Sequence, residues 1–204
     1  PAFKLDSAIN SFRYGIGRDL SGYEDGTENP EGDDALKAGF ISEQGPGLDG
    51  SSFVAVQKWI HDFKAFDSMS TNEQDNTIGR RISDNSEIDD APESAHVKRA
   101  AQESFKPEAF ILRRSMPWAE GMDAGLVFVS FGFSFKAFEA ILNRKLGTED
   151  TVSEALFSFT RPFSGATFWC LAVIDGKRNL SVLAMKGICI RKGMVTSKGL
   201  SENC

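Results

Sequence analysis

The pattern of hydrophobic and polar positions divides the chain near residue 50. Residues 1–50 show little periodicity and contain much Gly, Asp and Glu, and this composition predicts a loop-rich segment. Residues 51–63 are rich in aromatic and β-branched side chains and lie between turn signals, which predicts a strand. Similar apolar runs predict further strands over residues 109–114, 125–131 and 167–174.

Two segments carry clear helix signals. Ser70 and Glu73 form a capping-box pattern, which predicts a short helix that continues to about Ile82. Ser134 is expected to cap a second helix, which Gly147 stops. The apolar positions of this second helix recur at helical spacing: Phe135, Phe138, Ile141 and Leu142.

Strands and helices are mixed along the chain without a regular βαβ alternation. A further helix is expected over residues 151–157, and the acidic run of residues 83–93 indicates a solvated loop. This mixture favours an α+β fold built on an antiparallel sheet. We expect the loop-rich segment to be followed by one domain over residues 51–190 and by a polar tail over residues 191–204.

Composition narrows the functional classes. The chain has 204 residues, of which 41% are hydrophobic, and this is enough for one well-buried core. No apolar run is long enough to cross a bilayer, and a net charge of −6 without a basic patch argues against a nucleic-acid partner. The three cysteines are odd in number and far from any Cys-x-x-Cys spacing, which fits a reducing cytoplasm rather than a disulfide framework or a zinc site.

A glycine-flanked turn is the first candidate site. It comprises residues 22–30, with the sequence Gly-Tyr-Glu-Asp-Gly-Thr-Glu-Asn-Pro. Surface turns use Gly, Asp, Asn and Pro, so a surface turn is one interpretation. The other is that Gly22 and Gly26 let the backbone approach a large flat ligand while Asp25 directs its carboxylate toward it.

Imidazole and guanidinium groups supply further candidates. The chain has two histidines, and His96 follows the acidic loop, where it is either a surface residue or a ligand. His61 shares a strand face with apolar side chains and is expected to be structural. Arg113 ends an apolar strand segment, and an arginine there needs either an ordinary salt-bridge partner or a bound charged group.

Taken together, these residues resemble the dye-decolourising peroxidase family of haem enzymes. The family's Gly-x-x-Asp-Gly signature matches residues 22–26, and its Ser-His-Val-x-Arg element is similar to Ala-His-Val-Lys-Arg at residues 95–99. Its Arg-x-Ser-x-Pro-aromatic element matches residues 113–118, and its Phe-Thr-Lys/Arg-Pro-x-x-Gly element matches residues 159–165. The order and spacing also agree, so the resemblance covers about residues 12–175.

The resemblance implies a b-type haem whose iron takes its proximal ligand from His96. In the family, an acidic residue before the Phe-Thr element accepts the other ring N–H, which fixes the tautomer and makes the ligand more basic. By position this residue is Glu154, although relatives more often have Asp there, and an exposed, solvated glutamate is the competing interpretation. Arg99, three residues after His96, is expected to bind a haem propionate.

The resemblance assigns the distal side of the haem to Asp25 and Arg113. A carboxylate there can take a proton from one peroxide oxygen and give it to the other, and a guanidinium can stabilise charge on the breaking O–O bond. We expect the two residues to form an ion pair. Leu126 and Phe128 would form an apolar wall, although Phe128 is equally well explained as core. Ser115 takes a distal position as well, and the residues further expected to contact the cofactor are Glu28, Asn29, Ser115, Leu126 and Phe128.

The implied fold is the second half of a protein that has two ferredoxin-like α+β halves, with an antiparallel sheet and helices on one face. The Gly-x-x-Asp-Gly signature falls near the junction of the halves in the family and starts at residue 22 here, so we expect the N-terminal half to be absent. That half would pack against the sheet and cover apolar surface. It is therefore an expected partner, and the resemblance also implies a homo-oligomer.

The leading functional hypothesis is a haem peroxidase that uses hydrogen peroxide to oxidise small aromatic reductants such as dyes and phenols. A haem-binding or haem-handling protein with little turnover would share every binding residue, so it is the alternative. An inert α+β domain is a third possibility. Asp25→Asn separates the first two hypotheses, because only peroxidase turnover needs that carboxylate.

Overall fold

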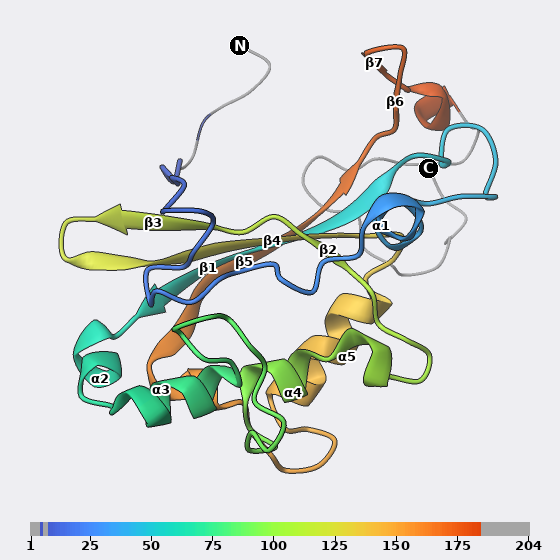
Figure 1. Cartoon of the computed structure of the whole chain (residues 1–204). Coiled ribbons are helices and arrows are strands. Elements are labelled where there is room, and N and C mark those ends of the chain that lie inside the picture. Colours follow the sequence, from blue (N-terminus) through green and yellow to red (C-terminus); the bar gives the residue numbers. More distant parts are fainter. Residues whose placement is uncertain (1–4, 6–7, 185–204) are drawn as a thin grey trace.

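The computed structural model describes residue 5 and residues 8–184, which form an antiparallel sheet with helices on one face (Figure 1). The sheet has five strands in the order β2-β4-β1-β5, and β3 also pairs with β4. These strands are β1 (Ser52–His61), β2 (Leu112–Arg113), β3 (Met116–Glu120), β4 (Asp123–Gly132) and β5 (Thr160–Cys170). A separate hairpin follows, made of β6 (Val173–Ile174) and β7 (Lys177–Arg178).

Helices α2 to α5 lie on one face of the sheet, so the fold is α+β and ferredoxin-like, as predicted (Figure 1). The helices are α1 (Gly32–Gly39), α2 (Phe63–Asp67), α3 (Thr71–Ile78), α4 (His96–Ala100) and α5 (Lys136–Lys145). Short 3₁₀ turns occupy Gln102–Ser104, Ala155–Ser158 and Ser181–Ala184. None of the helices in the described part of the chain is long and apolar enough to span a bilayer. The predicted tail, residues 191–204, lies outside the described residues.

Two predicted strands differ in extent from the observed ones. β2 is confined to Leu112–Arg113 because the preceding residues bond to Gln102: the N–H of Ala109 donates to its carbonyl (2.9 Å), and the N–H of Ile111 donates to its side-chain oxygen (2.7 Å). β5 begins at Thr160 rather than at residue 167, because its pairing with β1 extends to the end of that strand. β3 was not predicted.

The predicted helix after Ser70 is confirmed, but it is shorter than expected. Ser70 and Glu73 form both hydrogen bonds of the capping box. The helix ends at Ile78 because Gly79 has a φ of 91°, the left-handed conformation that terminates helices.

The prediction of a helix over residues 151–157 was wrong. Thr151 has a φ of 65°, and Glu154 has an extended backbone with φ −62° and ψ 134°, so neither residue continues a helix. One 3₁₀ turn follows, Ala155–Ser158. The loop-rich segment also contains a helix, α1, that the polar composition concealed.

The register of β1 places a row of side chains on the helix-bearing face. Trp59 pairs with Leu126 and Gln57 pairs with Phe128, and residues two apart along a strand point to the same face. β5 is an edge strand and is mostly exposed along its length. The side chains of this face therefore point into the space between the sheet and the helices.

Two apolar clusters pack the helices against neighbouring segments of the chain. The first contains Tyr23, Phe66, Ile78 and Phe159, and the second contains Phe105, Ala109, Ile111 and Ile141. Tyr23 belongs to the glycine-flanked turn, and its hydroxyl donates a hydrogen bond to Asp75 of α3 (2.5 Å). The turn is thus packed against α3, in contrast to a free surface turn.

Candidate functional site

A cavity lies between the sheet and helices α4 and α5, and its walls carry apolar and aromatic side chains with a few polar groups, as those of small-molecule and cofactor sites do. Its lining on the sheet side comes from Gln57, Trp59, His61, Leu126 and Phe128. Its lining on the helix side includes His96, Ala100, Phe138, Ile141, Leu142 and Lys145. Asp25 and Arg113 also line it, so the cavity brings together five predicted site residues: Asp25, His96, Arg113, Leu126 and Phe128.

His96 is the first residue of α4, and its imidazole lines the cavity. The residue before it, Ala95, is fully buried, and its N–H donates to the carbonyl of Pro92 (2.8 Å), which fixes the start of the helix. The Nδ1 atom of His96 is hydrogen-bonded to Oε1 of Glu154. An ionised carboxylate only accepts hydrogen bonds, so Nδ1 carries the proton and Nε2 is left for a ligand in the cavity.

Glu154 is buried, with 2% of its surface exposed, and its backbone is held on both sides. Its N–H donates to the carbonyl of Lys145 (2.8 Å), and the N–H of Ala155 donates to the carbonyl of Ser94 (2.7 Å). The Nζ atom of Lys145 lies 3.2 Å from Oε2 of Glu154. Burial by itself raises the pKa of Glu154, but the charge of Lys145 and the hydrogen bond from His96 outweigh burial and hold this pKa below its ordinary value.

Arg113 is fixed by the glycine-flanked turn. Its N–H donates to Oδ1 of Asn29 (2.8 Å), and its carbonyl accepts from Nδ2 of Asn29 (3.0 Å). Asn29 itself does not line the cavity. The Nε atom of Arg113 is buried and has no hydrogen-bond partner among the described residues, so it is a donor that a bound group could satisfy.

The expected ion pair between Asp25 and Arg113 is not formed. Both residues line the same cavity, but no nitrogen–oxygen contact within 4 Å joins them in the described part of the chain. The tight turn fixes Asp25 through its backbone, whose N–H donates to the carbonyl of Gly17 (3.3 Å). The two side chains therefore approach the cavity separately.

A second, more polar cavity adjoins the first. The two share Asp25, His96, Ala100, Gln102 and Arg113 as lining residues. Glu28, predicted to contact a cofactor, lines the second cavity, and its carboxylate pairs with Arg80 (2.5 Å). Arg80 also pairs with Glu87 (3.2 Å), which joins the turn to the acidic loop.

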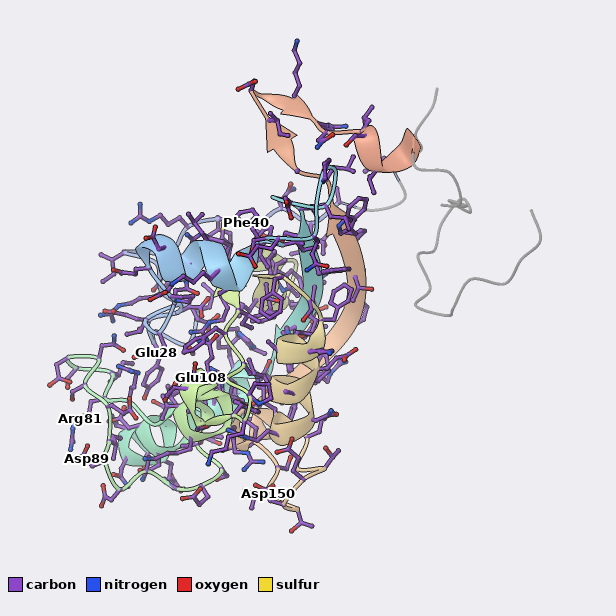
Figure 2. All side chains as sticks on the ribbon, turned by 90° about the vertical axis from the view of Figure 1, so that its right-hand side faces the viewer. Glu28, Phe40, Arg81, Asp89, Glu108 and Asp150 are labelled. Atoms are coloured by element: carbon purple, nitrogen blue, oxygen red, sulfur yellow. The ribbon has the colours of Figure 1, made fainter. Side chains whose placement is uncertain are left out.

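Arg99, predicted to bind a propionate, does not line either cavity. It is 3% exposed, and its guanidinium donates to both carboxylate oxygens of Asp150 (2.6 and 2.8 Å) and to the carbonyl of Arg144 (3.1 Å from Nε). The hydrogen bonds from Arg99 lower the pKa of Asp150 to about 2. Figure 2 shows Asp150 near the bottom of the molecule, below Phe40. Arg99 is therefore turned toward α5 and away from the cavity.

Ser115 also lies outside the lining of both cavities. Its Oγ atom is buried and has no hydrogen-bond partner among the residues that the structure describes. Of the residues predicted on the distal side, Leu126 and Phe128 do line the first cavity. Both belong to β4, the strand that pairs with β2 at Arg113.

Two titratable residues of the cavity lining were not predicted from the sequence. His61, expected to be structural, lines the cavity, and its Nδ1 lies 2.7 Å from Oγ1 of Thr160 while its Nε2 lies 3.2 Å from Oδ1 of Asp19. Lys145 is the other. Helical spacing could have found Lys145, because four residues at i, i+3, i+4 and i+7 share one face of α5: Phe138, Ile141, Leu142 and Lys145.

Fold and site together define a ferredoxin-like α+β domain with a histidine-centred cavity. An imidazole whose second nitrogen donates to a buried carboxylate is the usual arrangement of a histidine that binds a metal. Asp25 and Arg113 add an acid–base group and a permanent positive charge to the same cavity. Residues 17–175 match the family model described as "Dyp-type peroxidase, C-terminal", and the chain belongs to this family.

Comparisons with known proteins agree with this assignment. The chain is 34% identical over 167 residues to a dye-decolorizing peroxidase of Mycolicibacterium paratuberculosis, a match that covers 79% of this chain and 47% of the relative. It is 33% identical to the corresponding protein of Mycobacterium tuberculosis, with 79% and 50% covered. The chain thus spans about half the length of the curated relatives it matches.

Solved structures show the same fold. DypB from Rhodococcus jostii is 32% identical, with a TM-score of 0.74, and the match covers 80% of this chain and 55% of that one. A dye-decolorizing protein from V. cholerae is 29% identical, with a TM-score of 0.72 and with 78% and 54% covered.

Proposed function

We propose that this protein is a haem peroxidase that reduces hydrogen peroxide and oxidises small one-electron donors such as dyes and phenols. The observation that carries the proposal is the arrangement of one cavity. His96, backed by the buried Glu154, lines its helix side, and Asp25 and Arg113 reach it from the turn and from β2. The names of the relatives support the activity, and a variant of the Rhodococcus jostii protein is described in complex with heme.

The residues present fit haem b. The cavity is lined mainly by apolar and aromatic side chains, which suit a flat macrocycle. The Nδ1 atom of His96 is engaged with Glu154, so Nε2 is the atom that can bind iron. Among the residues that the structure describes, Nε of Arg113 has no hydrogen-bond partner, and it is a buried donor in the wall of the same cavity. An apolar cavity that contains one available imidazole nitrogen and one unpaired cationic donor matches the chemistry of the cofactor.

His96 and Glu154 would hold the haem. When bound, the haem would supply the redox-active iron at which the peroxide O–O bond is cleaved. Glu154 accepts the Nδ1 hydrogen of His96, which orients the ring and increases the basicity of Nε2. The two backbone hydrogen bonds around Glu154 keep this carboxylate in place, so the orientation of His96 is set before any ligand binds.

Asp25 and Arg113 would act on the peroxide. The carboxylate of Asp25 can take the proton from one peroxide oxygen and return it to the other, which leaves as water. The guanidinium of Arg113 stays charged and stabilises the negative charge that develops on the departing oxygen. Because no ion pair ties the two side chains together among the described residues, each is available to the peroxide.

Optical spectroscopy and steady-state kinetics test the proposal. The purified protein with haem should show a Soret band, and peroxide should change it. His96→Ala should lose the histidine-ligated spectrum, and added imidazole should restore it in part. Arg113→Ala should keep the spectrum but lower peroxide turnover by about 10²-fold or more, the scale seen when an electrostatic donor is removed from an active site.

The chain offers a matched control for Arg113. Arg114 is the next residue, carries the same charge and is exposed, so Arg114→Ala should leave turnover unchanged. Unchanged turnover in both His96→Ala and Arg113→Ala would contradict the proposal. A haem-loaded protein in which Asp25→Asn has no kinetic effect would instead support a haem-binding protein with little turnover.

The open face of the sheet supports a proposal about the partner. Phe163 and Phe168 of β5 are 60% and 53% exposed, and Met116 of β3 is 48% exposed. A second ferredoxin-like half, as expected for the N-terminal part of the family fold, would bury such side chains. Joining this chain to the N-terminal half of the Rhodococcus jostii relative should raise the Tm, and Phe168→Asp should abolish the gain. An equal Tm for the joined and separate chains would contradict this pairing.

A further inference from the structure

The two oxygens of Glu154 have different neighbours, and among the described residues Oε1 makes a hydrogen bond whereas Oε2 takes part only in an ion pair. Oε1 accepts from Nδ1 of His96, and Oε2 lies 3.2 Å from Nζ of Lys145. The side chain of Glu154 is fully buried, and that of Lys145 is only 15% exposed. Water screens charges little at such a place, so the ammonium group acts strongly on the carboxylate.

Lys145 is held in this position by more than its charge. It lies in the last turn of α5, and its carbonyl accepts the N–H of Glu154 (2.8 Å). Its Nζ atom lies 5.5 Å from the centre of the Trp59 ring, within the range of a cation–π contact. The backbone and the side chain of one residue therefore fix the backbone and the side chain of Glu154.

This geometry links Lys145 to the imidazole. The strength of the hydrogen bond from His96 depends on the negative charge on Oε1, because a more basic carboxylate attracts the Nδ1 hydrogen more strongly. A cation at Oε2 draws charge away from Oε1. With Lys145 in place, the carboxylate stays ionised but pulls less on the hydrogen than an uncompensated buried carboxylate would.

We propose that Lys145 is a positioning residue that sets the strength of the His96–Glu154 hydrogen bond, and through it the electron donation from His96 to a bound iron. The second part rests on the proposed function, which makes His96 the iron ligand. The first part concerns only three side chains of this chain and holds without haem. The two parts can therefore be tested separately.

Proton NMR of the haem-free protein tests the first part. The Nδ1 hydrogen of His96 should give a downfield resonance, which His96→Ala removes. Lys145→Met should move this resonance further downfield, because the bond to Glu154 strengthens, and Lys145→Arg should leave it near the wild-type position. Lys136→Met makes the same chemical change at the exposed start of α5 and should have no effect. An unmoved resonance in Lys145→Met would overturn the proposal.

The midpoint potential of the haem-loaded protein tests the second part. Lys145→Met should shift the potential to more negative values, because a more strongly donating imidazole favours ferric iron. Removal of the positive charge of Lys145 would also lower the midpoint potential directly, without acting through Glu154. The Lys145→Met change is therefore repeated in the Glu154→Gln variant. Lys145→Met should then cause a clearly smaller shift. An equal shift in both backgrounds would show that Lys145 acts directly on the iron and would overturn the proposal.

A second variant covers the case in which Lys145→Met does not fold. Lys145→Gln keeps a hydrogen-bond donor but removes the charge, and the same two shifts are expected for it. If the wild-type protein binds no haem or shows no peroxide turnover, the proposed function fails. The NMR measurement still decides the role of Lys145 in that case.

Discussion

Asn29 and Arg113 lie 84 residues apart and are joined by two hydrogen bonds between a side chain and a backbone. The amide of Asn29 accepts from the N–H of Arg113 and donates to its carbonyl, as a neighbouring strand would. β2 has only two residues, so little else in the sheet fixes this part of the backbone. The turn thereby determines where the guanidinium of Arg113 enters the cavity.

We expect Asn29→Ala to slow the reaction with peroxide more than it weakens haem binding. Two hydrogen bonds are lost, each contributing about 0.5–1.5 kcal/mol to stability, and the backbone of Arg113 is released. Stopped-flow kinetics should show a slower reaction with peroxide, and the Soret band from His96 ligation should remain. Glu31→Ala, at an exposed position just after the turn, is the control. A wild-type reaction rate in Asn29→Ala would contradict this role.

The turn shows how far the sequence could predict the site. Its glycines and Asp25 pointed to a ligand-binding turn, and Asp25 does line the cavity. Its neighbours Glu28 and Asn29 were expected to contact a cofactor, but one pairs with Arg80 and the other supports Arg113. A local sequence pattern does not say which segment 84 residues away will lie opposite, so these partners could only come from the structure.

Gly79 allows α3 to approach α4 closely at the position of His96. A Cβ atom at Gly79 would overlap with Cγ2 of Val97 and lie 3.3 Å from Cβ of Ala95, the residues on either side of His96. We expect Gly79→Ala to lower the free energy of unfolding by about 1–3 kcal/mol from overpacking, in addition to the cost of its φ of 91°. Thermal unfolding measures this loss of stability.

The control for this prediction is Gly121→Ala. Gly121 has a φ of 61°, but no atom in the described part of the chain lies within 4 Å of an added Cβ. Its substitution should cost only the left-handed conformation, roughly 1–2 kcal/mol. Equal losses of stability at the two positions would show that the contact between α3 and α4 is not tight.

Arg99 is expected to stabilise the fold, and its loss should leave the haem environment nearly unchanged. Its guanidinium is buried and joins α4 to Asp150 and to the carbonyl of Arg144. Arg99→Lys cannot make these paired contacts and should lower the Tm, while a haem-loaded sample should keep its Soret maximum. Lys98→Ala changes the neighbouring cation and serves as the control. A shifted Soret maximum at an unchanged Tm would support the propionate role instead.

Arg99 was predicted to bind the cofactor but does not line the cavity, whereas Lys145 lines it and was predictable from helical spacing. The length of the two helices explains this difference. α4 has five residues, too few for a helical wheel to define which side faces the cavity, and Arg99 turns toward α5. α5 has ten residues, and its periodicity does place Lys145 on the same face as the apolar lining residues. The strands β1 and β4 were predictable for a similar reason, because they are long and have strong apolar patterns. Short elements depend on contacts that only the folded chain supplies.

The buried pair of Asp19 and His61 should make stability depend on pH. Burial raises the pKa of Asp19, but the hydrogen bond and charge of His61 lower this pKa by more than burial raises it. The pKa of Asp19 therefore lies below the ordinary value of 3.8. A lowered carboxylate pKa gives stability that is fully present above the unfolded-state pKa and is lost as the pH falls through the folded-state value. Asp19→Asn should therefore cost about 1.5–3 kcal/mol in urea unfolding at pH 5 and less at pH 3. Asp33→Asn, at an exposed position of α1, should cost little at either pH. A cost for Asp19→Asn that is the same at both values would refute the pairing.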